Sequence, residues 1–202
     1  LAHCHAAQQT FDFCETKGIE VEVLVNNAGM FFFDAITNEN IARSETMVHL
    51  HVTTPTLLCS LFGKAMKQRG KGYILNVSSI SAWMPYPGLA IYAASKRYVK
   101  EFSRAIRYEF NDFGVKVCAV CPGAVDTSLY KLSPNFRRVL RKWGVMHSTD
   151  ALAKKGVNAL FRGKVIYIPG LINRIVKFLV LLIPPFVINY VKRKAKLKQL
   201  MK

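Results

Sequence analysis

The chain has 202 residues, enough for one domain with a sizeable core, and 51% of them are apolar. A net charge of +17 raises the question of nucleic acid. However, Lys and Arg alternate with Leu, Ile and Val rather than with stacking aromatics, and no nucleic-acid motif is visible, so we expect no nucleic-acid partner. The five cysteines show no paired spacing, which favours a reducing, cytoplasmic compartment.

Apolar runs alternate with helical patterns along the chain. The predicted elements are a helix at 1–17, a strand at 21–26, helices across 38–68, strand 72–77, helix 88–112, strand 115–120, short helices in a loop at 124–146, helix 149–162 and strand 164–168. Thr149-Asp150 is expected to cap the last helix. Strand alternating with helix predicts an α/β fold with a doubly wound parallel sheet.

Three of these strands end in distinctive polar residues. The first runs into Asn26-Asn27-Ala28-Gly29, the second into Ser78-Ser79, and the third into Pro122-Gly123, followed by Thr127. Ligands of open α/β sheets bind at the carboxyl ends of the strands. We therefore expect one site to gather all three.

Tyr92 and Lys96 lie four residues apart on the predicted 88–112 helix and so share one face. A nearby ammonium favours the phenolate and brings a tyrosine closer to useful acid-base chemistry near neutral pH. Ser79, from a strand end, could hold a carbonyl or alcohol oxygen. Taken alone, Tyr-x-x-x-Lys is more often a plain helix face, but the strand-end residues favour chemistry here.

In these motifs, taken in order, the sequence resembles the short-chain dehydrogenase/reductase family. The resemblance extends to about residue 170 and implies a Rossmann-like fold, an NADP or NAD cofactor, and hydride transfer between a carbonyl and an alcohol. It implies that Tyr92 is the general acid/base, that Ser79 orients the substrate, and that Lys96 assists Tyr92 and contacts the cofactor. The cofactor-binding residues that it implies are Asn27, Ala28, Gly29, Tyr92, Lys96, Val125 and Thr127.

His51 departs from the family pattern, which usually has an asparagine here that kinks the helix and holds a water molecule of a proton relay. A histidine can also hold water and titrates near neutrality, so His51 is a candidate catalytic residue. The alternative is a helix histidine without a role.

The second departure is that no Gly-x-x-x-Gly-x-Gly or Gly-x-Gly-x-x-Gly precedes Asn26. The family opens with a strand and such a turn, which receives the cofactor pyrophosphate. We expect the chain to lack roughly 60 residues of this fold, including its first strands and the residue that selects NAD or NADP. A targeting or membrane segment could also precede it.

The charge is uneven. Residues 1–130 carry 12 Lys and Arg against 11 Asp and Glu, whereas residues 131–202 carry 17 against 1. We divide the chain into a dehydrogenase part, 1–170, and a tail, 171–202, that is first apolar and then basic. The tail could cover the substrate or form oligomer contacts, bind a membrane surface peripherally, or remain a solvated basic segment. Its apolar runs are too short to span a bilayer.

The motifs favour an enzyme acting on a small lipophilic carbonyl or alcohol, and the resemblance suggests a homo-oligomer. The alternatives are a catalytically idle member that senses cofactor or acts as a scaffold, and a membrane-surface module. Cys118-x-x-Cys121 is not expected to bind metal, because residues three apart on a strand face opposite sides and no second pair exists.

Overall fold

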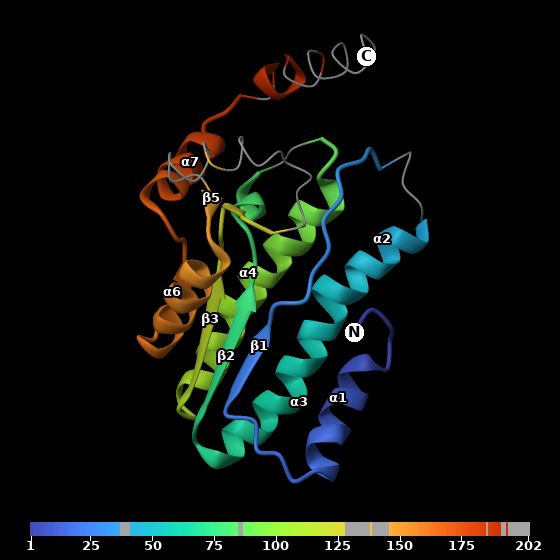
Figure 1. Cartoon of the computed structure of the whole chain (residues 1–202), viewed down its shortest axis with the longest axis vertical. Helices are drawn as coiled ribbons and strands as arrows, with labels where there is room; N and C mark the ends of the chain where they lie inside the picture. The colour runs from blue at the N-terminus through green and yellow to red at the C-terminus, as the bar shows by residue number, and fades with distance from the viewer. Residues whose placement is uncertain are drawn as a thin grey trace.

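The computed structural model describes residues 1–36, 41–84, 87–127, 138, 146–184, 186–190 and 193. A four-stranded parallel sheet in the order β1-β2-β3-β6 forms its centre (Figure 1). Its strands are β1 (Val23–Asn26), β2 (Gly72–Val77), β3 (Val115–Val120) and β6 (Ile166–Tyr167). The predicted α/β class with a parallel, Rossmann-like sheet is confirmed.

Helices cover both faces of this sheet (Figure 1). Three helices pack on one face: α1 (Ala6–Thr16), α3 (Thr54–Arg69) and α4 (Ala90–Asn111). The other face carries α6 (Thr149–Phe161). Successive strand residues serve opposite faces, so Ile74 joins the core under α3 and α4 whereas Leu75 joins the core under α6.

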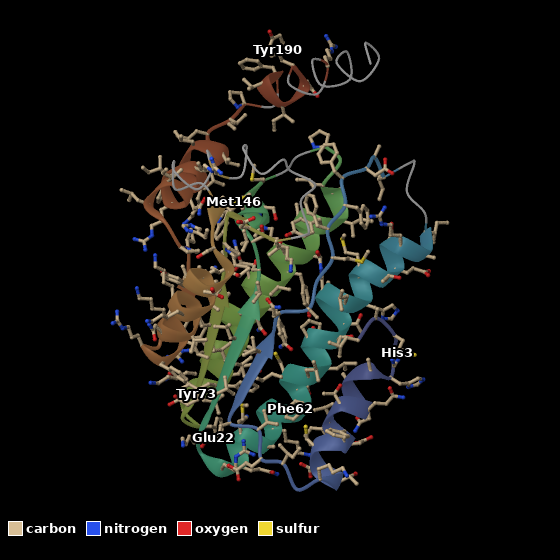
Figure 2. The ribbon with its side chains drawn as sticks, in the orientation of Figure 1. His3, Glu22, Phe62, Tyr73, Met146 and Tyr190 are labelled. Atoms are coloured by element: carbon tan, nitrogen blue, oxygen red, sulfur yellow. The ribbon has the colours of Figure 1, made fainter. Side chains whose placement is uncertain are left out.

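The predicted helical stretch across 38–68 is interrupted in the structure. It consists of α2 (Ile41–Val48), one π-helical turn (His49–Thr53) and α3, which Gly70 ends with a φ of +68°. Phe62 of α3 lies toward α1, where its ring meets that of Phe11 with centroids 5.1 Å apart (Figure 2). The helix α3 thus packs against both the sheet and α1.

Short elements complete the fold. A 3₁₀ turn (Ile80–Trp83) follows β2, and β4 (Ala124–Val125) pairs in parallel with β5 (Met146–His147). The prediction that Thr149-Asp150 caps α6 was wrong by one residue. The N-cap is Ser148, whose Oγ accepts from the Ala151 N–H at 3.4 Å. Most of the short helices expected at 124–146, and all of the basic segment 192–198 except residue 193, lie outside the described residues.

The last described elements are α7 (Leu171–Leu181) and a helical segment at 186–190. Both lie beyond the end of the sheet at which β1, β2 and β3 finish, with Tyr190 far from the core (Figures 1 and 2). Within the part of the chain that the structure describes, no helix is both long enough and apolar enough to cross a membrane.

Candidate active site

The ends of β1 and β2 are fixed to each other and to α4 by one side chain. Asn26 pairs with Asn76 in the strand register, and the Asn26 Nδ2 donates to the Asn76 Oδ1 at 2.7 Å. The Asn76 Nδ2 donates to Ser103 Oγ on α4 at 2.9 Å. The turn that follows β1, Asn26-Asn27-Ala28-Gly29 (the 26–29 turn), is therefore held at a defined distance from α4.

Tyr92 and Lys96 lie on the first two turns of α4 and are buried, with 9% and 6% of their surfaces exposed. Ser78 joins this part of the helix to the end of β2, because its Oγ donates to the Lys96 carbonyl at 2.6 Å. The strand end and the helix therefore move as one unit, which keeps Ser79 in place relative to Tyr92.

The Lys96 ammonium is buried. Its Nζ donates to the Val77 carbonyl at 3.0 Å and lies 5.8 Å from the centroid of the Tyr92 ring. Burial lowers the pKa of Lys96 to about 8, and the nearby Cys121 opposes this shift. The ammonium is thus charged near neutrality and ready to stabilise a neighbouring phenolate.

Ser79 begins the 3₁₀ turn that follows β2. Its Oγ accepts from the Ser81 N–H at 3.1 Å, so the hydroxyl proton remains available for another acceptor. Tyr92 is held by aromatic packing, with the Phe31 ring at 5.0 Å in an edge-on arrangement. Both hydroxyl-bearing side chains line the same cavity.

This strand-end cavity has a volume of about 670 Å³ and is lined by residues from all three strand ends. Of the residues proposed from the sequence, eight line it: Asn27, Ala28, Gly29, Ser79, Tyr92, Lys96, Val125 and Thr127. His51 is not among its lining residues and is 1% exposed. The expectation that His51 titrates near neutrality was wrong, because burial, and then the charge of Lys96, lower its pKa to about 3.

Two glycines allow close approach of backbone at this cavity. A Cβ on Gly29 would lie 3.1 Å from His51 Nε2 and 3.6 Å from Lys96 Nζ. A Cβ on Gly123 would collide with the side-chain amide of Asn173, which is buried at the start of α7. The 26–29 turn can therefore present backbone rather than side chain next to Lys96.

Sequence reasoning missed the wall that α6 contributes. Five residues of this helix line the cavity, namely Thr149, Leu152, Ala153, Gly156 and Val157. Their spacing of three and four residues marks one helix face, but the sequence does not say which element that face covers. No role was predicted for Ser78 or Ser95, although Ser78 Oγ donates to the Lys96 carbonyl of α4 and Ser95 Oγ, on α4, lies 2.9 Å from His51 Nδ1.

The cysteines of Cys118-x-x-Cys121 are both fully buried. Burial raises the pKa of the Cys118 thiol to about 12 and that of Cys121 to about 11. Cys118 packs in the core under α6 with Leu75 and Val120. Both thiols therefore remain protonated and behave as small apolar side chains.

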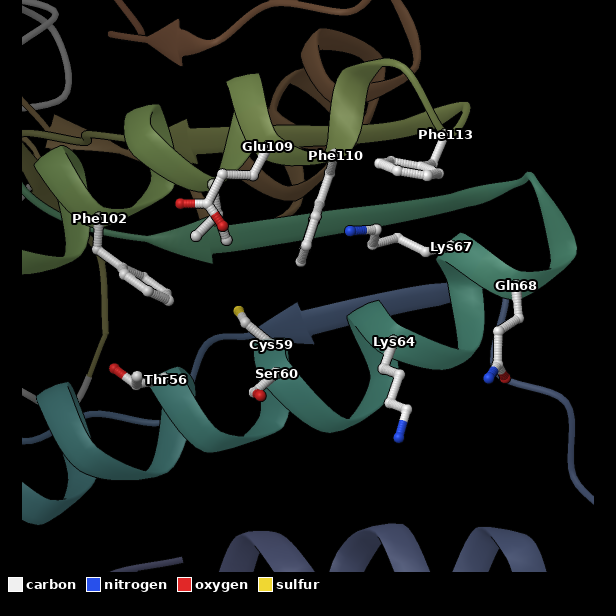
Figure 3. A pocket seen from close by; sticks show the side chains of 11 residues that line it. Thr56, Cys59, Ser60, Lys64, Lys67, Gln68, Phe102, Glu109, Phe110 and Phe113 are labelled. Carbon is white, nitrogen blue, oxygen red and sulfur yellow. The ribbon is translucent and has the colours of Figure 1, made fainter.

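A second hollow, the α3/α4 groove, lies between α3 and α4 and has a volume of about 650 Å³ (Figure 3). Phe102, Phe110 and Phe113 border it on the α4 side, and Cys59 and Lys67 on the α3 side. The Lys67 ammonium lies 4.0 Å from the centroid of the Phe113 ring. The groove is separate from the strand-end cavity, since no residue lines both.

Comparison with known proteins agrees with this geometry. The family model described as short chain dehydrogenase matches residues 1–136, and the chain belongs to this family. It is 35% identical over 121 residues to 17-beta-hydroxysteroid dehydrogenase type 3 of Mus musculus, covering 59% of this chain and 40% of the relative. It is 34% identical over 135 residues to the very-long-chain 3-oxoacyl-CoA reductase of Homo sapiens, covering 63% and 43%.

The chain thus spans about two fifths of the length of these curated relatives. Among solved structures, a gluconate 5-dehydrogenase from Burkholderia cenocepacia in complex with NADP and tartrate superposes with a TM-score of 0.72 at 19% identity. The superposition covers 84% of this chain and 71% of that one. At this identity the likeness concerns the fold alone.

The buried Lys96 makes a testable contribution to stability. Its pKa is lowered in the folded state, so between about pH 8 and about pH 10.5 the unfolded chain binds more protons than the folded one. The contribution of Lys96 to the free energy of unfolding must then rise with pH across this window. Urea unfolding of the wild type and of Lys96→Met should show the wild type gaining stability relative to the variant over that range. Lys155→Met, at an exposed position of α6, is the matched control. A difference that stays constant, or moves the other way, would contradict a buried ammonium.

Proposed function

We propose that this protein is an NAD(P)-dependent oxidoreductase that interconverts a carbonyl and an alcohol on a lipophilic substrate, with Tyr92 as its general acid/base. The observation that carries the proposal is that Ser79, Tyr92 and Lys96 line one cavity together with Asn27, Ala28 and Gly29 of the 26–29 turn. An acid, an oxygen-orienting hydroxyl and a cation at one cavity are the groups that proton transfer to a carbonyl oxygen requires.

In the reducing direction, Ser79 Oγ donates a hydrogen bond to the substrate carbonyl oxygen and holds it near the Tyr92 hydroxyl. Tyr92 then gives its proton to that oxygen, and the resulting phenolate lies beside the Lys96 ammonium. A bound nicotinamide cofactor supplies or accepts the hydride. Since the pKa of Lys96 is about 8, the ammonium is charged near neutral pH and lost at higher pH.

The residues at the cavity fit such a cofactor. An ammonium has three N–H donors, and among the described residues Lys96 Nζ donates to the Val77 carbonyl. Its remaining donors suit the hydroxyl groups of a ribose. Gly29 has no side chain, so the 26–29 turn presents only backbone toward Lys96; a Cβ there would lie 3.6 Å from Nζ. Thr127 and Val125 border the same cavity and are the residues that we assign to the nicotinamide side.

A lipophilic substrate is supported by the walls of the cavity. Met30, Val77, Leu152 and Val157 line it, together with Val25, Leu75 and Val120. The names of the two relatives refer to hydroxysteroids and to very-long-chain 3-oxoacyl-CoA thioesters, both of which present a carbonyl or alcohol on a large apolar body. We therefore propose steroid-like or acyl substrates.

The first test is Tyr92→Phe in the full-length protein. Because the ring is kept and the proton donor is lost, turnover of hydrophobic ketones should fall by at least about a hundredfold. The panel would contain a steroid ketone, a 3-oxoacyl thioester and an aromatic ketone, each with NADPH and with NADH. Cofactor absorbance measures turnover, and cofactor fluorescence measures binding.

Tyr108→Phe provides a matched control, since Tyr108 lies on the same helix but is 73% exposed and does not line the cavity. Undiminished turnover in Tyr92→Phe would refute the assigned mechanism. Cofactor binding by the wild type without turnover of any ketone would instead favour the catalytically idle alternative, a cofactor sensor or scaffold.

We further propose that α7 binds an anionic membrane surface. Six apolar side chains at helical spacing, on or next to α7, are between 38% and 76% exposed: Leu171, Ile172, Ile175, Phe178, Leu179 and Leu182. Asn173 fixes the start of the helix, because its Nδ2 lies 3.2 Å from His147 Nε2 on β5 and donates to the Pro169 carbonyl at 2.8 Å. Residues 131–202 hold 17 basic side chains against one acidic. An apolar stripe next to dense positive charge is typical of helices that lie in an anionic lipid interface.

Vesicle binding tests this proposal with the double change Ile175→Glu and Phe178→Glu. We expect the wild type to co-sediment with vesicles containing about 30% phosphatidylserine, and the double variant to lose at least tenfold in affinity. Ile41→Glu is the matched control, because Ile41 is 77% exposed but lies on α2. Equal binding of wild type and double variant would exclude α7 as the contact.

We also propose that a second copy of the chain covers the α3/α4 groove. Its lining includes both basic and acidic side chains, Lys64 and Lys67 opposite Glu109, and a two-fold axis would place each sign against the other. Leu57, Tyr98 and Phe113, on or next to these two helices, are between 38% and 44% exposed. An exposed apolar groove bordered by both charges suits a self-complementary partner.

Sedimentation velocity distinguishes the oligomeric states. The wild type should sediment as a dimer or larger, and Phe113→Glu should shift it toward the monomer, because the new carboxylate would be desolvated at the interface. Tyr108→Glu, on an exposed face of α4 outside the groove, should leave the assembly unchanged. A monomeric wild type would rule the interface out.

A further inference from the structure

His51 lies behind the strand-end cavity, between the 26–29 turn and α4. It belongs to the π-helical turn His49–Thr53, and its side chain is almost fully enclosed. Both ring nitrogens have partners. The Met30 backbone N–H lies 3.0 Å from Nε2, and the Ser95 Oγ lies 2.9 Å from Nδ1.

The direction of each hydrogen bond follows from the chemistry of the partners. A backbone N–H can only donate, so Nε2 accepts from Met30 and carries no proton. The neutral ring then carries its hydrogen on Nδ1 and donates to Ser95 Oγ, while the Ser95 hydroxyl donates to the Tyr92 carbonyl at 2.8 Å. Met30, His51, Ser95 and Tyr92 thus form one directed chain of hydrogen bonds.

This chain joins the two parts of the candidate site. Met30 follows the 26–29 turn directly, and Ser95 lies between Tyr92 and Lys96 on α4. The imidazole also limits how close the two parts come, since a Cβ at Gly29 would lie 3.1 Å from Nε2. The His51 ring meets the Tyr92 ring edge-on, with centroids 5.8 Å apart. His51 therefore contacts the turn, the helix and the acid/base itself.

We infer that His51 is a positioning residue, a neutral clamp that sets the distance between the 26–29 turn and the catalytic helix through Met30 and Ser95. It carries no proton in the reaction, and it acts through the placement of Tyr92 and Lys96 relative to the turn. The inference rests on the proposed function for its catalytic consequence, whereas the clamp itself is a property of the fold. Displacement of a catalytic group by about 1 Å can cost about a hundredfold in rate.

The decisive variants are His51→Phe and His51→Gln in the full-length protein. Phenylalanine keeps a ring of similar size but can bond neither Met30 nor Ser95. Glutamine can still accept from the Met30 N–H through its carbonyl oxygen and donate through its amide. We expect His51→Phe to lose about a hundredfold in kcat/KM for the ketone panel and to raise the KM for NADPH. His51→Gln should recover at least tenfold of that loss.

Met66→Ala is the control for plain destabilisation, because Met66 of α3 is fully buried in the core and does not line the cavity. It should lower the melting temperature without changing the KM for NADPH. If His51→Phe changes kinetics only as much as Met66→Ala does at equal folded fraction, His51 is a packing residue and the clamp is refuted.

Two readouts do not depend on turnover. Amide hydrogen exchange should show Met30 protected in the wild type and in His51→Gln but exchanging faster in His51→Phe. Two-bond ¹H–¹⁵N correlation should show His51 as the Nδ1–H tautomer without titration from about pH 5 to about pH 9. A titration midpoint near the ordinary value for histidine, or unchanged Met30 exchange in His51→Phe, would overturn the clamp. If both readouts show the clamp in the wild type but the wild type is inactive, only the proposed function would be overturned.

Discussion

One buried amide, that of Asn76, determines how the parts of the site lie relative to one another. Its Oδ1 accepts from Asn26 on β1 and its Nδ2 donates to Ser103 on α4, and the side chain is fully enclosed. A buried polar group left without a partner costs about 1–3 kcal/mol, so the two strands and the helix favour the placement in which both bonds form. That placement brings Lys96 toward the 26–29 turn.

Lys96 shows what this arrangement costs. Burial opposes its charge and lowers its pKa to about 8, so the ammonium works against folding at neutral pH. An apolar side chain of similar length would fill the same space without that penalty. The chain nevertheless has a lysine there, one helical turn from Tyr92 and beside a bare glycine turn. Local exceptions of this kind are expected where function, rather than stability, sets the residue.

The sequence predicted the strands and the cavity residues better than the contacts between helices. β2 and β3 have the predicted bounds, because each is a short apolar run between a glycine turn and a polar strand end. Parallel strands that end at one edge brought their motifs together without further information. The wall formed by α6 and the bond between His51 and Ser95 could not be predicted, since residues 44 positions apart meet only through the packing of whole helices.

The same packing decides which side chain of the site carries the positive charge. If His51 were protonated, its Nε2 could no longer accept from Met30, and a second cation would be buried close to the Lys96 ammonium. Desolvation and repulsion act together, which is why the pKa of His51 falls to about 3 while that of Lys96 stays near 8. The charge is therefore confined to the residue nearest the cavity, where it can stabilise a phenolate at Tyr92. The neutral imidazole of His51 can then accept the hydrogen bond from the Met30 N–H next to the 26–29 turn.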